Sequence, residues 1–208
     1  MDPPIWSVPR LWDGERVFIL GGGPSLKGFG AECLRGKGRV LVVNTSYKLV
    51  PFADALYFAD KRWFDWEEPG VRRWTALKVT INADAWRRDD ALKLIRSGKM
   101  GGLSEDPTTV NLGNNSGFQA INLAFHLGAG RIVLLGFDMR WHGSGPSIVT
   151  HWHGGHPRSQ VATVFTRMIP AFDTIRKPLE RHGVEVVNAT PDSALKTWPM
   201  VQLADELM

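Results

Sequence analysis

The sequence predicts an α/β protein with a Rossmann-like, doubly wound and mainly parallel sheet. Short apolar runs alternate with longer amphipathic segments along most of the chain, which is the pattern of βαβ units. Runs such as VLVV and IVLL are continuously apolar, as in strands that helices cover on both faces. Glycines and polar residues follow these runs directly. We therefore expect one domain over 15–208, preceded by an N-terminal arm over 1–14.

Six segments have the length and composition of buried strands. In chain order they are RVFIL (16–20), RVLVVN (39–44), ALYFAD (55–60), LKVTIN (77–82), RIVLLGFD (131–138) and VEVVNA (184–189). 

Two long helices are expected between and after these strands. In 116–129 apolar residues recur at helical spacing, with Ser116 as the expected N-cap and Gly128 at the C-terminal end. The segment 159–183 has one apolar face, and its two internal prolines should kink or divide it.

The segment 83–115 is rich in charge and glycine and has no long apolar run. We expect a short helix in AWRRDDALKLIRSG (85–98) and loop elsewhere, so that 83–115 and 139–157 form a small lid or lobe. Cys33 is the only cysteine, which excludes an intramolecular disulfide and a multi-cysteine metal site. We expect it to be a small buried residue in a short helix.

The formal net charge of +4 fits an anionic ligand. No run of Lys or Arg is long enough for a nucleic-acid footprint, so we expect no nucleic-acid partner. No apolar run approaches the roughly 18 residues of a membrane span. The start MDPPIWSVPR lacks the pattern of a signal peptide, so a cytoplasmic location is expected. A homo-oligomer is left open.

Candidate ligand-binding residues lie where strands end, and ligands of open α/β sheets bind outside the carboxyl ends of the strands. After the first strand, GGGPS supplies Gly22, Gly23, Pro24 and Ser25. Their backbone can approach a phosphate closely and donate N–H groups to it. The alternative is an ordinary glycine turn, which is common after a strand.

Three further strand ends carry polar residues or glycine. Asn44 can read a ribose hydroxyl or a base edge, or can simply form a turn. Asp60 can accept from ribose, coordinate a metal ion or cap the next helix. Gly136 permits a close approach, and Asp138 lies where a ribose or a metal would be read.

The start of the 116–129 helix is unusually rich in donors. Asn114, Asn115, Ser116 and Gly117 cluster there, where the helix dipole favours an anion. A simple cap is the alternative reading.

The stretch HWHGGHP contains His151, His153 and His156. One interpretation is a metal site, which Asp60 or Asp138 would complete. A second is a general base close to an acceptor hydroxyl, and a third is a solvated polar loop.

In this order the motifs resemble those of bacterial α-2,3/α-2,8 sialyltransferases, glycosyltransferase family 42. The resemblance rests on GGGPSL after the first strand, Asn44 after the second, NSG (115–117) before a helix, LGAGRIVLLGFD with a histidine-containing loop, and the tail GVEVVNATPDSALKTWP. It covers roughly 16–207. The pattern ADALYFADKRWFD, NSGFQAINLAFHLGAGRIVLLGFDM and HWHGGHP is similar to that of phage and prophage proteins of unknown function.

The resemblance implies a CMP-sugar donor, no required metal or cofactor, and a histidine general base, whose place His156 takes. Arg140 falls near one of two positions where the family has tyrosines that bind the leaving phosphate. Asn114 replaces an arginine, and Asp60 lies beside the position of a family asparagine. The donor sugar is therefore left open. The residues that match donor-binding positions are Gly22, Gly23, Pro24, Ser25, Asn44, Asn115, Ser116 and Gly117.

The function that we expect is a sialyltransferase-like glycosyltransferase that uses a small-molecule nucleotide-sugar and a sugar or glycan acceptor. Its donor phosphate would bind the amides of Gly22, Gly23 and Ser116. One alternative is a Mg²⁺- and ATP-dependent diphosphotransferase, because archaeal-type 6-hydroxymethylpterin pyrophosphokinases have a similar start; Asp60 and Asp138 would then hold Mg²⁺. The other is a non-catalytic nucleotide-binding phage protein, located in the host cytoplasm.

Overall fold

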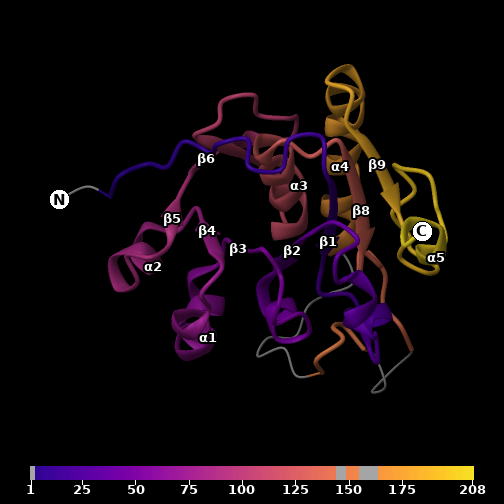
Figure 1. The fold of residues 1–208 in the computed structure, drawn as a ribbon, viewed down its shortest axis with the longest axis horizontal. Coiled ribbons are helices and arrows are strands. Elements are labelled where there is room, and N and C mark those ends of the chain that lie inside the picture. The colour runs from indigo at the N-terminus through magenta and orange to yellow at the C-terminus, as the bar shows by residue number, and fades with distance from the viewer. Residues whose placement is uncertain (1–2, 144–148, 155–163) are drawn as a thin grey trace.

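The computed structural model describes residues 3–143, 149–154 and 164–208. Its centre is a sheet of seven strands, all paired in parallel, in the order β5-β4-β3-β2-β1-β8-β9 (Figure 1). The strands are β1 (Arg16–Leu20), β2 (Arg39–Val43), β3 (Ala55–Phe58), β4 (Leu77–Thr80), β5 (Lys93–Leu94), β8 (Arg131–Leu135) and β9 (Glu185–Asn188). All six strands that the sequence predicts are present, and the predicted fold class is confirmed.

The sheet is doubly wound around β1. From β1 the chain adds strands β2 to β5 on one side, and later β8 and β9 on the other. Leu20 is in register with Val42 of β2 and with Leu135 of β8. The order therefore reverses between β1 and β8, which is the switch point where open α/β sheets bind ligands.

Alternate residues of β1 pack into two separate cores. Val17 and Ile19 face a core that includes the helices α3 (Ser116–Leu127) and α4 (Val164–Arg181). Phe18 and Leu20 face a second core. On that side lie the 3-10 helices η1 (Pro24–Leu26), η2 (Ala31–Leu34) and η3 (Asn44–Lys48), and the helices α1 (Lys61–Arg73), α2 (Ala83–Arg88) and α5 (Leu203–Glu206). Burial on both faces explains why the strands are continuously apolar.

The expectation of a helix over 85–98 is wrong beyond Arg88. At Asp89 the backbone becomes extended, and its carboxylate lies 2.8 Å from the Lys78 Nζ in a buried ion pair. The chain then adds β5 to the sheet, with Leu94 in register with Thr80. β6 (Arg96–Met100) and β7 (Thr109–Leu112) form a separate two-stranded parallel sheet. A short buried strand has too few residues to show its period in a charged segment.

Two other sequence-based expectations are corrected. α4 runs without interruption through Pro170 and Pro178, so these prolines do not divide it. Cys33 is exposed rather than buried, because η2 turns its neighbours Ala31 and Leu34 toward the core.

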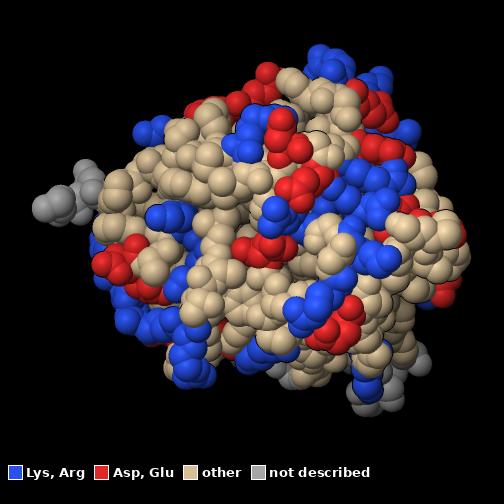
Figure 2. All heavy atoms as spheres, in the orientation of Figure 1, with Lys and Arg blue, Asp and Glu red and all other residues tan. Residues whose placement is uncertain are grey.

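The residues before β1 pack along the domain. The Trp6 amide donates to the Leu94 carbonyl, the Val8 amide to Pro107 and the Trp12 amide to Leu127. Val8 and Trp12 are buried. On the face shown in Figure 2, basic and acidic side chains are interspersed. None of the helices in the described part of the chain has the length and apolar character that crossing a bilayer requires.

Candidate functional site

A cavity of about 730 Å³ lies at the carboxyl ends of the parallel strands. The segments after β1, β2, β3, β4 and β8 all contribute to its wall, and the first turn of α3 closes it from one side. Most of the residues that the sequence singles out line it: Gly22, Gly23, Pro24, Asn44, Asp60, Asn115, Ser116, Gly117, Gly136, Asp138, Arg140, His151 and His153. The two turns near Gly23 and Ser116 therefore share one pocket.

The Gly23 and Ser25 amides of the glycine-rich turn after β1 bond within the protein. The Gly23 N–H donates to the Gly136 carbonyl at 2.9 Å. The Ser25 N–H and hydroxyl donate to the two oxygens of Asp138, at 3.0 and 2.7 Å. The Gly23 N–H is therefore engaged by Gly136 and both Ser25 donors by Asp138, and the expectation that this turn binds a phosphate stays a prediction.

Close packing, rather than ligand approach, requires the glycines at two positions. A Cβ on Gly23 would lie 1.9 Å from an Asp138 oxygen and 2.6 Å from the Gly136 carbonyl oxygen. Gly136 has a φ of +69°, and a Cβ there would lie 2.5 Å from Leu26. Gly136 thus permits a close contact between the β1 and β8 turns, and its expected approach to a ligand stays a prediction.

Asp138 is buried and held in place by hydrogen bonds from Ser25. Its side chain is 1% exposed, accepts both bonds from Ser25, and has the His142 Nε2 2.8 Å from one oxygen. It is thus engaged before any ribose or metal binds, which makes it a residue that positions the glycine turn.

The first turn of α3 keeps its amides open to the cavity. Asn115 is the N-cap: its Oδ1 accepts from the Phe118 N–H at 2.7 Å, and its Nδ2 donates to the Gly113 carbonyl at 2.8 Å. Ser116 is therefore the first helical residue, and the expectation that it is the cap is wrong. In an α-helix the first N–H groups have no carbonyl one turn earlier to bind. Ser116 and Gly117 thus present donors at the positive end of a 12-residue helix.

Asn44 and Asp60 lie at the ends of neighbouring strands. Asn44 adopts the left-handed region, with φ of 51°, and among the described residues its buried Oδ1 has no hydrogen-bond partner. Asp60 caps α1 by accepting from the Arg62 N–H at 2.8 Å. The predicted capping role is confirmed, while its carboxylate also lines the cavity.

The segment 149–154 packs against the glycine turn. The Trp152 N–H donates to the Gly22 carbonyl at 3.2 Å, and its indole N–H donates to the Ser46 hydroxyl at 3.2 Å. These bonds hold His151 and His153 on the cavity wall, with their ring centroids 5.2 Å apart. His156 lies outside the described residues.

Within the described ranges, no group of three or more His, Cys, Asp or Glu side chains is close enough together to hold a metal ion. The alternative site of His151, His153 and His156 includes one residue outside those ranges. Arg140 is exposed at the cavity, and its Nη1 donates to the Asp192 carbonyl at 3.2 Å.

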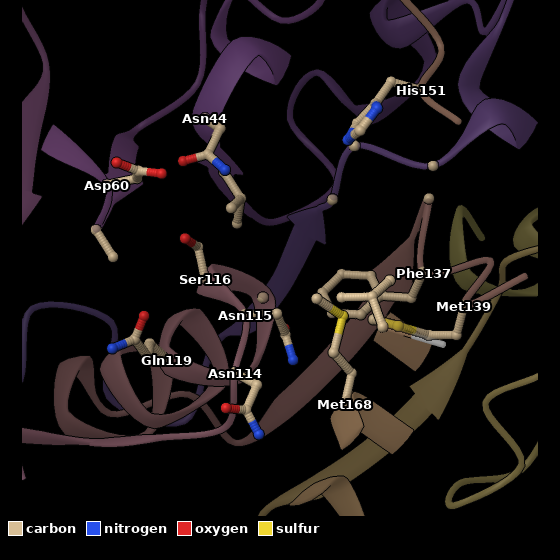
Figure 3. A pocket seen from close by; sticks show the side chains of 18 of the residues that line it. Asn44, Asp60, Asn114, Asn115, Ser116, Gln119, Phe137, Met139, His151 and Met168 are labelled. Atoms are coloured by element: carbon tan, nitrogen blue, oxygen red, sulfur yellow. The ribbon is translucent and has the colours of Figure 1, made fainter. Parts of the chain in front are cut away.

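The sequence analysis did not identify Gln119 on α3 and Met168 on α4 as residues of the cavity wall. Gln119 is 3% exposed and lines the cavity three residues after Ser116. Met139, Met168 and Phe137 lie together on another part of the wall (Figure 3). Helical spacing from Ser116 was the signal that would have found Gln119; for Met168 the sequence carries no such signal.

The fold was compared with those of known proteins. A solved structure of the sialyltransferase CstII from Campylobacter jejuni, in complex with a substrate analogue, cytidine-5'-monophosphate, superposes with a TM-score of 0.54. The two chains share one fold. The match covers 91% of this chain and 85% of CstII at 14% sequence identity. No protein-family model and no curated protein sequence matches the chain significantly.

Proposed function

We propose that the protein is a glycosyltransferase that takes its sugar from a nucleotide-sugar bound in this cavity. The observation that carries the proposal is the meeting of the Gly22–Gly23 turn with the first turn of α3 at the switch point of the sheet. Open α/β sheets bind nucleotides at such points. The fold shared with a sialyltransferase that was solved with cytidine-5'-monophosphate supports the same ligand class, so a CMP-sugar is the first donor to test.

The donor phosphate in this proposal lies against the N–H groups of Ser116 and Gly117. These amides lie at the N-terminus of a 12-residue helix, where the helix dipole favours negative charge. The glycine turn lies beside the phosphate in this proposal. The Gly23 N–H does not donate to the phosphate, because it donates to the Gly136 carbonyl.

The chemical step needs a base and a stabilised leaving group. A histidine removes the proton of the acceptor hydroxyl as its oxygen attacks the anomeric carbon, and the bond from that carbon to the phosphate oxygen breaks with its electron pair on the nucleotide. The family resemblance favours His156 as the base, and His151 competes because it lines the cavity. Arg140 would offset the charge of the departing phosphate.

The diphosphotransferase alternative gains no support from the geometry. It requires Asp138 as a Mg²⁺ ligand, whereas both oxygens of Asp138 accept from Ser25. Nucleotide binding that depends strictly on Mg²⁺ would favour it nevertheless.

The test has two stages. Calorimetric titration with CMP, UDP and GDP comes first, and failure of all three to bind would overturn the donor site. In the second stage His156→Ala should keep its nucleotide affinity within about twofold and lose transfer by about a hundredfold or more.

The variants His151→Ala and His153→Ala, with the distant His182→Ala as control, complete the second stage. Loss confined to His151→Ala would move the base to that residue. Nucleotide binding with no transfer from any donor would favour the non-catalytic alternative.

A further inference from the structure

One part of the cavity wall consists of polar side chains that have no cationic partner within the described residues. We name this part the amide corner: Asn44 after β2, Asp60 after β3, and Ser116 and Gln119 on α3. Figure 3 shows the Ser116 hydroxyl on the side of the cavity that faces Asn44 and Asp60, with Met139 and Met168 beside Phe137 elsewhere on the wall.

One atom of the amide corner is buried with unused hydrogen-bonding capacity. Asn44 Oδ1 is inaccessible to water and has no partner within the described residues. Gln119 is 3% exposed and lines the cavity. Buried polar groups without partners are costly, so native proteins retain few of them. One such atom on the cavity wall, Asn44 Oδ1, indicates that a ligand completes its bonding.

The hydrogen-bond acceptors and the charge of the amide corner limit which chemical groups of a ligand can bind there. Asp60 and Asn44 Oδ1 accept hydrogen bonds, so the ligand must donate there, as hydroxyl and amide N–H groups do. A carboxylate cannot donate, and beside Asp60 it would meet a like charge. Among the described lining residues Arg140 is the only Lys or Arg, and it follows β8, whereas Asn44 and Asp60 follow β2 and β3.

Another part of the cavity wall is apolar, so the two parts of a nucleotide-sugar donor would bind to different parts of the wall. A nucleobase has two apolar faces, which suit Phe137, Met139 and Met168. A sugar carries several hydroxyl groups, which suit the amide corner. Ser116 and Gly117 lie at the junction, where the phosphate would join the two parts.

We infer that the amide corner holds the transferred sugar and that this sugar is neutral, carrying hydroxyl or N-acyl groups, rather than an acidic sugar such as sialic acid. The inference rests on the proposed function and narrows its donor class. It separates this protein in specificity from the sialyltransferase whose fold it shares.

The first experiment measures how much each sugar adds to the affinity of its nucleotide. Calorimetry compares UDP with UDP-glucose and UDP-N-acetylglucosamine, GDP with GDP-mannose, and CMP with CMP-N-acetylneuraminic acid. At least one neutral sugar should tighten binding by about fivefold or more, and the sialyl group should not tighten it. Equal or greater tightening by the sialyl group, or none by any neutral sugar, would overturn the inference. Failure of every nucleotide to bind would instead overturn the proposed function, and the inference with it.

The second experiment removes the charge at Asp60. Asn is as good an N-cap as Asp, so Asp60→Asn should leave α1 intact, which thermal unfolding checks. It should improve the contribution of the sialyl group by about tenfold and weaken that of the neutral sugar by a similar factor. Asp65→Asn is the matched control, because it removes a carboxylate of α1 that pairs with Lys61 at 2.8 Å.

Gln119→Met provides an independent check, since it replaces the amide by an apolar side chain of similar length. It should lower the contribution of the neutral sugar several-fold more than the affinity for the nucleotide alone. Unchanged sugar contributions in both Asp60→Asn and Gln119→Met would contradict the assignment of the amide corner.

Discussion

The turn after β1 and the turn before α3 have similar sequences and opposite roles. Both are rich in small and polar residues, and the sequence predicts that both bind phosphate. In the first, Gly23 and Ser25 donate to Gly136 and Asp138. In the second, the Asn115 cap leaves Ser116 and Gly117 facing the cavity. Donors in a turn rich in glycine and serine are thus engaged within the protein in one place and face the cavity in the other.

The difference comes from what lies beside each turn. β1 and β8 are neighbours, and their ladder continues past their ends as Gly21 donates to Leu135 and Gly23 to Gly136. Asp138 follows directly and takes the remaining donors. At α3 the Asn115 side chain caps the helix by accepting from the Phe118 N–H.

Gly23→Ala should give the largest effect, because it breaks the first turn. The new Cβ would lie 2.6 Å from the Gly136 carbonyl oxygen, which is backbone and cannot rotate away. We expect a loss of about 3 kcal/mol in the free energy of unfolding, measured in urea. Gly30→Ala is the matched control, since nothing lies within 4 Å of its Cβ. Equal stability of the two variants would show that the turn adapts.

Asn115→Ala should have an intermediate effect and should act on both stability and ligand binding. Loss of the cap should cost about 1 kcal/mol and weaken nucleotide binding several-fold, because the Ser116 and Gly117 amides lose their fixed direction. Asn82→Ala is the control: Asn82 caps α2 by accepting from Ala85 at 2.9 Å. It should cost similar stability and leave nucleotide affinity unchanged. The same loss of affinity in both variants would mean that α3 has no special role.

The smallest effect is a pH dependence at the far end of α3. Burial lowers the pKa of His126, whose Nε2 lies 2.8 Å from the Thr109 carbonyl of β7. The unfolded chain therefore binds a proton there more readily than the folded chain, and stability should fall as the pH drops below about 6.5. Urea unfolding between about pH 5 and pH 7.5 should show a shallower slope in His126→Gln than in the wild type. A matching reduction in the exposed control His182→Gln would assign the slope elsewhere.

The strands were predictable because each is buried on both faces and is therefore continuously apolar. Their carboxyl ends could be placed at one edge, and the polar residues Asn44 and Asp60 with them. The strands at 93–94 and 96–100 were missed because the first has only two residues and the second is largely exposed, so neither has an apolar run. Gln119 was missed since a mid-helix glutamine ordinarily faces solvent.

The amino-acid sequence alone determined the doubly wound sheet, the edge at which its ligand-binding residues gather, and the two turns that meet there. It determined these because burial fixes the period of apolar residues and parallel connections align the strand ends. Tertiary structure alone decided which backbone amides stay open and that Asp138 fills the glycine turn. Hydrogen bonds between segments as distant as Ser25 and Asp138 depend on spatial proximity, which no local pattern encodes.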